Sequence, residues 1–371
     1  MTPFDDVAMS METDSFVSLK NAKEVVEEMQ EHDDGPRFAC SLESLEKKPQ
    51  DRYKLIRSIG VGGMKYVLLV YDRDTGREIA MALMPDFRER SPQLLEQFIR
   101  EARITAYLEH PNIVAVHDIG LDSNDAPFYT MSYLRGLPLT TVLKRIRDGR
   151  EFETHYYSLD RRLRIFQRIC NAVNYAHSKN ICHLDIKPDN VNVGEYGEVR
   201  LFDWGLACET DDEGNAIFAR EGKLQGTPSF MAPEQISVNP DAPKVGKRSD
   251  IFALGALLYS MLTLSLPFSG RNSEEALLKT LSEEPPRMRK VAPPDMEIPI
   301  ELEAVCRKAM AKNPADRYGS ISELRQAVMN VQKRYFLANI NAGRKRSKIS
   351  IIIMLLFIIL IAILLYLGIL F

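Results

Sequence analysis

The residues with the clearest chemical potential lie in one stretch, residues 183–205. This stretch contains Asp185, Asn190 and Asp203, whose side chains supply carboxylate and amide oxygens. Mg²⁺ prefers hard oxygen ligands of this kind and is usually held by one or two carboxylates together with substrate phosphates. Phosphoryl transfer depends on such metal-bound carboxylates and on a positioned acceptor more than on covalent chemistry by the protein. The residue types in this stretch are therefore ones that phosphoryl transfer can use.

The order of these residues is specific. The stretch begins His-Leu-Asp-Ile-Lys-Pro-Asp-Asn, passes through an apolar strand and ends in Asp-Trp-Gly. This order resembles the catalytic and metal-binding loops of eukaryotic-type (Hanks-type) serine/threonine protein kinases, and it looks most like the bacterial membrane-bound members. The resemblance implies ATP and Mg²⁺ as cofactors and a protein hydroxyl as acceptor. It makes Asp185 the base and Lys187 a stabiliser of phosphate charge, while Asn190 and Asp203 become metal ligands.

Three later segments extend the resemblance. Residues 226–234 match the family's substrate-binding and Ala-Pro-Glu segment, and Thr227 matches the threonine of the serine/threonine signature. By resemblance, Asp250 anchors the catalytic-loop backbone from a large central helix, and Arg317 pairs with Glu234. The resemblance implies that the segment 226–234 docks a polypeptide, which disfavours the alternative of a small-molecule kinase.

The resemblance covers residues 53 to about 330 and implies an α+β, two-lobed protein kinase fold. Residues 53–134 would form a small five-stranded antiparallel lobe with one main helix, and residues 135–335 a larger, mainly helical lobe. The local patterns agree with the small lobe. Strand-like runs occur at 53–56, 66–70, 78–84, 114–116 and 128–131, and a helix opens at Ser91-Pro92.

The nucleotide site is expected around a glycine-rich turn, Gly60-Val61-Gly62-Gly63, where backbone amides can approach phosphates closely. The resemblance adds further lining residues, with a hinge at 133–138 and an adenine floor from the large lobe. They are Ile59, Val67, Ala80, Met131 (the gatekeeper), Tyr133 and Asn192. A polar residue such as Asn192 in the adenine floor would weaken or redirect nucleotide binding.

The chain departs from the family pattern where the phosphates bind. The third-strand lysine is replaced by Ala82, and the third glycine of the loop is replaced by Lys65. The with-no-lysine kinases show the same pair of changes. Neighbouring antiparallel strands hold side chains roughly 5 Å apart, so Lys65 can reach the site that Ala82 cannot. Glu101, a carboxylate on an otherwise apolar helical face, would then hold Lys65.

The alternative is a catalytically inactive pseudokinase that serves as a membrane-anchored scaffold. In that interpretation Lys65 is an exposed surface lysine. Against it, Asp185, Lys187, Asn190 and Asp203 are all retained. A chain released from catalysis has no need to keep them.

The residue before Asp185 is Leu184, where the family usually has an arginine. A phosphate in the activation segment would therefore lack its usual counter-charge. We expect activity to depend little on phosphorylation at Thr210 or Ser229.

Composition excludes several other functions. The chain has 48 basic and 51 acidic residues, so it is no polycation and we expect no nucleic-acid partner. Its five cysteines are odd in number and lack CxxC spacing, which indicates reduced thiols and no zinc site. Residues 1–50 carry 12 acidic and 5 basic side chains, which favours a polar, flexible segment.

Residues 349–371 form an apolar run of 23 residues without a charge. At about 1.5 Å per residue this run spans a hydrocarbon core of about 30 Å, which predicts a single transmembrane helix. A buried core helix is the alternative. The basic linker 336–348 would place the kinase lobes in the cytoplasm. The helix would be an anchor or a dimerisation element, although it has no GxxxG.

Overall fold

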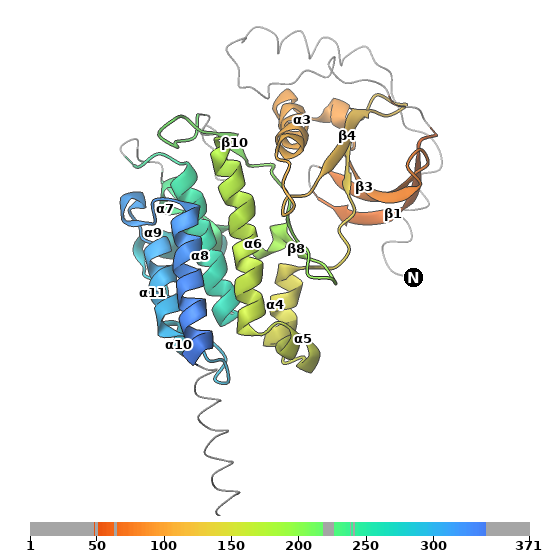
Figure 1. Cartoon of the computed structure of the whole chain (residues 1–371). Helices are drawn as coiled ribbons and strands as arrows, with labels where there is room; N and C mark the ends of the chain where they lie inside the picture. Colours follow the sequence, from red (N-terminus) through yellow and green to blue (C-terminus); the bar gives the residue numbers. More distant parts are fainter. Residues whose placement is uncertain are drawn as a thin grey trace, which may run out of the picture.

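The computed structural model describes residues 48, 51–62, 65–217, 226–237, 239 and 242–338. Figure 1 shows the strands of a small lobe beside a larger bundle of helices. The small lobe is a five-stranded antiparallel sheet with the strand order β1-β2-β3-β5-β4. Its strands are β1 (Tyr53–Val61), β2 (Tyr66–Asp72), β3 (Arg77–Leu83), β4 (Val116–Leu121) and β5 (Pro127–Ser132).

Helix α3 (Pro92–Tyr107) covers one face of this sheet. It begins as expected, with Ser91 at the N-cap and Pro92 at the first helical position, where the missing N–H costs nothing. The helix buries Leu95, Phe98 and Ile99 against the sheet. Glu101 is buried on the same helix, which gives α3 one charged position facing the small-lobe core.

The strand expected at 114–116 is present, but its bounds are wrong, because β4 begins only at Val116 and runs to Leu121. The residues before it are drawn to the other lobe. Val114 N donates to Leu201 O at 3.0 Å, and Ile113 forms a parallel bridge with Leu201. This short pairing uses the backbone groups that a longer β4 would need, and it links the two lobes.

The large lobe is mainly helical, as expected from the resemblance. Its helices are α4 (Leu139–Arg147), α5 (Glu151–Tyr156), α6 (Leu159–Ser178), α7 (Pro233–Ile236), α8 (Lys247–Thr263), α9 (Ser273–Ser282), α10 (Met288–Val291), α11 (Ile300–Ala309) and a helix over 321–338. Its short strands are β6 (Leu137–Pro138), β7 (Ile181–Cys182), β8 (Val191–Val193), β9 (Val199–Leu201) and β10 (Cys208–Glu209). Single 3-10 turns lie at Phe87–Glu89, Pro188–Asn190, Pro228–Phe230 and Pro314–Asp316.

Helix α8 is the centre of this lobe. Every residue from Ser249 to the end of the helix is buried, which is the pattern of a helix surrounded by protein on all sides. The helices α6, α10 and α11 pack against it, and Figure 1 shows α8 between α6 and α11. Side chains that α8 directs toward the lobe interface are therefore held in a fixed position.

The membrane prediction falls outside this description. Among residues 48–338, apart from the gaps given above, no helix is both long enough and apolar enough to span a bilayer. The apolar run at 349–371 lies outside the described residues, as do the linker from 339 to 348 and nearly all of 1–50.

A buried ion pair ties the segment at 226–237 to the end of the lobe. Arg317 donates from Nη1 and Nη2 to the two oxygens of Glu234, at 2.7 and 2.8 Å, as the resemblance implied. The two side chains are 0% and 1% exposed. Arg317 also donates to the carbonyls of Arg248 and Ala311, so its charge is fully hydrogen-bonded.

We expect Arg317→Ala to lower the free energy of unfolding by about 3–5 kcal/mol, because it leaves the Glu234 carboxylate buried and unpaired. Urea unfolding followed by the fluorescence of the single tryptophan, Trp204, measures this. The control is Arg271→Ala, since Arg271 forms an ion pair but its side chain is 93% exposed. That change should shift stability by less than about 0.5 kcal/mol, and equal losses in both variants would contradict the assignment.

Candidate active site

The backbone of the loop after β7 is fixed by Asp250 of α8. This carboxylate is fully buried and accepts the backbone N–H groups of His183 and Leu184, both at 2.8 Å. Its Oδ2 also lies 2.8 Å from His177 Nε2 on α6. Leu184 adopts φ 64°, a left-handed conformation that costs a non-glycine residue about 1–2 kcal/mol. The two hydrogen bonds to Asp250 hold that conformation in place.

Asp185, Lys187 and Asn190 form one hydrogen-bonded cluster. Lys187 Nζ donates to Asp185 Oδ2 at 2.6 Å, and Asn190 Nδ2 donates to Asp185 Oδ2 at 3.1 Å and to its carbonyl at 2.9 Å. The Asp185 side chain is only 9% exposed. Its carboxylate is therefore oriented by two donors from its own loop.

Asp203 follows β9 and also has a positive φ, 63°. Burial acts to raise the pKa of its carboxyl, but the charge of Lys65, with a smaller electrostatic contribution from His183, outweighs this and holds the pKa below its ordinary value. Asp203 therefore remains an anion. Gly205, two residues later, lies against Glu101, since a Cβ added there would meet Glu101 Oε2 at 3.3 Å.

Lys65 points into the site and contacts three oxygens. Its Nζ forms an ion pair with Glu101 Oε1 and lies 3.4 Å from Asp203 Oδ1. It also donates to the Tyr129 hydroxyl at 3.3 Å. Burial acts to lower the pKa of Lys65, but the surrounding oxygens outweigh it and hold the pKa well above its ordinary value. The expected pairing of Lys65 with Glu101 is present.

Tyr129 is a member of this cluster that the sequence analysis missed. Its hydroxyl donates to Glu101 Oε1 at 2.9 Å. The residue lies in β5 directly opposite Ala82 of β3. A tyrosine in an apolar strand looks like an ordinary core residue, so only the replacement of lysine by Ala82 across the sheet signals a special environment.

The expected nucleotide-binding residues come from both lobes. In the small lobe, Gly60 and Val67 face each other across β1 and β2, and Gly62 N donates to Lys65 O at 3.0 Å. Gly63 lies outside the described residues. On β1, Ile59 is half-buried and Val61 is 67% exposed.

The remaining residues of this set belong to β3, the hinge and β8. Ala80 pairs with Met131 across β3 and β5. Tyr133 follows β5, and its hydroxyl accepts a hydrogen bond from Arg57 at 3.1 Å. Asn192 is buried in β8 between Pro138 of β6 and Arg200 of β9. These residues thus come from β3, β5, the hinge after β5 and β8.

The donor set fits Mg²⁺. Asp203 supplies a carboxylate, and Asn190 has its amide oxygen available because its two side-chain hydrogen bonds use the nitrogen. Within the described residues no group of three or more His, Cys, Asp or Glu side chains could hold a metal by itself. Two oxygen ligands from the protein match the way Mg²⁺ is bound together with substrate phosphates.

Comparison with known proteins agrees with this geometry. The family model described as the protein kinase domain matches residues 53–336. Serine/threonine-protein kinase PknD of Chlamydia trachomatis (serovar D) is 38% identical over 300 residues, which cover 75% of this chain and 31% of that protein. The protein of the same name from Chlamydia pneumoniae is 35% identical over 294 residues, with 75% and 31% covered.

The chain belongs to the protein kinase domain family. It spans about a third of the length of these curated relatives. Within the kinase domain, the positions of Asp185, Asn190 and Asp203 follow the family motif. Lys65 stands where the glycine-rich motif has its third glycine, and Tyr129 lies outside these motifs.

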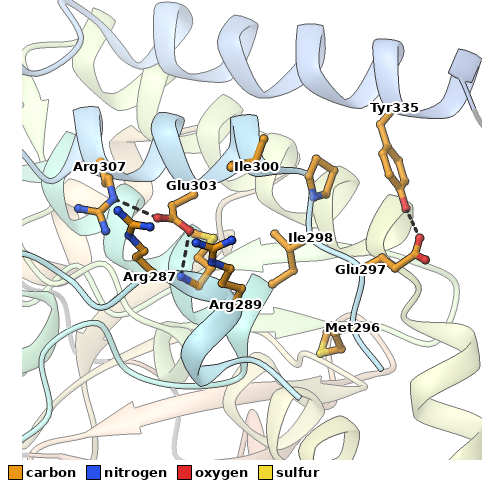
Figure 2. Close-up of a pocket in the computed structure, with 11 residues that line it drawn as sticks. Arg287, Arg289, Met296, Glu297, Ile298, Ile300, Glu303, Arg307 and Tyr335 are labelled. Carbon is orange, nitrogen blue, oxygen red and sulfur yellow. Dashed lines mark hydrogen bonds and ion pairs between the residues drawn. The ribbon is translucent and has the colours of Figure 1, made fainter. Parts of the chain in front are cut away.

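The kinase domain also contains a cavity of about 870 Å³ that shares no residue with this site. It lies between α10, α11 and the helix over 321–338 (Figure 2). The two carboxylates of its wall are already partnered. Glu303 accepts from Arg307 and from the backbone of Met288, and Glu297 accepts from the Tyr335 hydroxyl at 3.3 Å. These contacts brace the wall of the cavity, and we assign it no chemistry.

We expect Asp250→Asn to loosen the loop at His183 and Leu184. The amide keeps one acceptor oxygen, so one of the two buried N–H groups loses its partner, at a cost of about 1–3 kcal/mol. Hydrogen exchange measured on peptides covering 181–186 should become faster, and urea stability should fall. The matched control is Asp316→Asn, because Asp316 is exposed. Unchanged exchange at 183 and 184 would contradict the anchoring role.

Proposed function

We propose that this protein is a serine/threonine protein kinase that transfers the γ-phosphate of ATP to a protein hydroxyl, with Lys65 in place of the third-strand lysine. The observation that carries this proposal is the position of the Lys65 ammonium. It lies between Glu101 and Asp203, at the junction of the two lobes, although it comes from the glycine-rich loop end of β2.

The residues of the site have distinct roles in this proposal. Asp185 accepts the proton of the substrate hydroxyl, and its orientation comes from the two donors Lys187 and Asn190. Lys187 offers a positive charge beside the acceptor. Lys65 orients the phosphates, Glu101 holds Lys65, and the backbone of the loop at 60–63 covers the nucleotide. The residues Ile59, Val67, Ala80, Met131, Tyr133 and Asn192 border the base.

Mg²⁺ would be held by Asn190 and Asp203, and it would neutralise phosphate charge when bound. Asp203 is suited to this because its pKa lies below the ordinary value, so the carboxylate is an anion at neutral pH. Its carboxylate lies 3.4 Å from the Lys65 ammonium.

The Leu184 position supports activity without activation-segment phosphorylation. The residues 205–232 contain only three hydroxyl side chains, Thr210, Thr227 and Ser229. Thr210 and Ser229 are buried, and Leu184 offers no counter-charge for a phosphate. We propose that the kinase activity is regulated by something other than phosphorylation of this segment.

The competing proposal is a pseudokinase scaffold, and two observations favour it. Ala82 removes the lysine that the family uses, and Asn192 is buried where the family has an apolar side chain. Against it, a pseudokinase has no reason to keep the Lys65 ammonium among three oxygens of the site.

We expect Lys65→Met and Asp185→Asn each to lower the rate of γ-phosphate transfer by at least about a hundredfold, since one removes the phosphate cation and the other the base. The measurement is transfer of labelled γ-phosphate from ATP to the protein itself and to a generic protein substrate. The control is Lys54→Met, because Lys54 is an exposed lysine of β1 in the same hairpin.

The outcomes separate the proposals. If transfer is lost in both Lys65→Met and Asp185→Asn while Lys54→Met stays active, the result supports Lys65 as the replacement for the third-strand lysine. If transfer is lost only in Asp185→Asn, the protein is a kinase in which another cation binds the phosphates. ATP binding without transfer in the unchanged protein contradicts the kinase proposal and supports the scaffold.

We also propose that residues 349–371 tether the kinase domain to a membrane, with the lobes in the cytoplasm. The support is the uncharged 23-residue run and the basic residues Arg344, Lys345, Arg346 and Lys348 before it. We expect the full chain to sediment with membranes and to resist extraction with carbonate. A chain ending at residue 348 should be recovered in the supernatant. Recovery of the full chain in the supernatant would contradict tethering.

A further inference from the structure

Tyr129 and Ala82 occupy facing positions in the small-lobe sheet. They are directly opposite in the β3–β5 pairing, so their side chains extend to the same face, toward α3. They are 2% and 0% exposed. The small side chain of Ala82 therefore leaves space beneath the sheet, and the ring of Tyr129 packs beside it in the same core cluster.

The hydroxyl of Tyr129 lies between the two charges of the Lys65–Glu101 pair. It donates to Glu101 Oε1 at 2.9 Å and accepts from Lys65 Nζ at 3.3 Å. Burial raises the pKa of this phenol far above its ordinary value, so the group stays a neutral hydroxyl that can do both. The ring is held by Phe98, with centroids 5.2 Å apart.

Lys65 needs such a partner more than a strand lysine would. It precedes β2 and follows the glycine-rich turn, and its side chain is 21% exposed. A lysine stem has four rotatable bonds and an ammonium that pairs as a point charge without a fixed direction. The ion pairs with Glu101 and Asp203 therefore fix distances more than direction, whereas a neutral hydroxyl on a rigid ring supplies a further fixed point.

We propose that Tyr129 is the positioning residue for Lys65. Its hydroxyl holds the Lys65 ammonium beside Glu101, whereas a lysine on the third strand would be placed there by its attachment to that strand. This inference rests on the proposed function, in which Lys65 orients the phosphates. Ala82, Lys65 and Tyr129 then form one unit. Ala82 leaves space, the ring of Tyr129 packs beside it, and Lys65 extends into the site from the position before β2.

The first test is Tyr129→Phe, which removes only the hydroxyl. A hydrogen bond to a charged group corresponds to about a tenfold to hundredfold change in rate. We expect kcat to fall by that factor while the KM for ATP changes less than about threefold, because a misdirected Lys65 loses transition-state contacts. An unchanged kcat in an active protein would overturn the proposal.

A second variant separates positioning from general damage. If Tyr129 acts through Lys65, adding Tyr129→Phe to Lys65→Met should leave the residual transfer rate unchanged, within about twofold. A further tenfold loss in the double variant would show that Tyr129 acts elsewhere and would overturn the proposal. The matched control is Tyr259→Phe, which removes another buried hydroxyl, donated to Pro286 O at 2.9 Å in the large lobe. It should lower stability without changing kcat.

A third measurement does not need phosphoryl transfer. The full chain is treated with an amine-reactive ester over a range of pH, and labelling of Lys65 is followed by peptide mass spectrometry. Loss of the hydroxyl removes one acceptor from the ammonium, so Lys65 should react several-fold faster in Tyr129→Phe and at its normal rate in Tyr259→Phe. Equal labelling in all three proteins overturns the positioning role. If transfer is absent from the unchanged protein but labelling changes as expected, the proposed function fails and the contact of Tyr129 with Lys65 stands.

Discussion

The site depends on one buried carboxylate, Glu101, on the face of α3 that packs against the small-lobe sheet. An unpaired charge there would be very costly, so the helix can occupy this position only with a cation beside it. Lys65 supplies that cation from the end of β2, and it also contacts Asp203 from the large lobe. A single ammonium thus links the glycine-rich loop, α3 and the segment after β9.

The large lobe also contains buried carboxylates that are stabilised by hydrogen-bond donors, but the donors are different. Asp250 on α8 is satisfied by two backbone N–H groups, and Glu234 is satisfied by the guanidinium of Arg317. Asp250 thereby binds the loop at 183–184 to α8, and Glu234 binds the short helix α7 to the end of the lobe. Such fully hydrogen-bonded charges add little net stability, but removing one partner is expensive, so they define a unique arrangement of the loops. The catalytic loop keeps its left-handed residue Leu184 for this reason.

Much of this arrangement was predictable from the sequence. Periodicity indicated the strands and α3, and the motif order indicated that Asp250 would meet the loop and that Arg317 would meet Glu234. The features that could not be predicted have physical causes. The boundary of β4 depends on Ile113 and Val114, which pair with β9, a contact between residues far apart in the chain. Local pattern contains no information about such a pairing.

The direction of a side chain is harder still to predict. A lysine after a glycine-rich turn can point to solvent or to the cleft, and its own sequence neighbours favour neither. What decides the direction is the set of acceptors already present beneath the sheet. Glu101 supplies one, and the Tyr129 hydroxyl opposite Ala82 supplies another. A lysine at 82 would extend from the same face into the region where that hydroxyl lies. The loss of one lysine and the inward position of another are therefore parts of one packing arrangement. This coupling gives a physical reason why the two departures from the family pattern occur together in this chain.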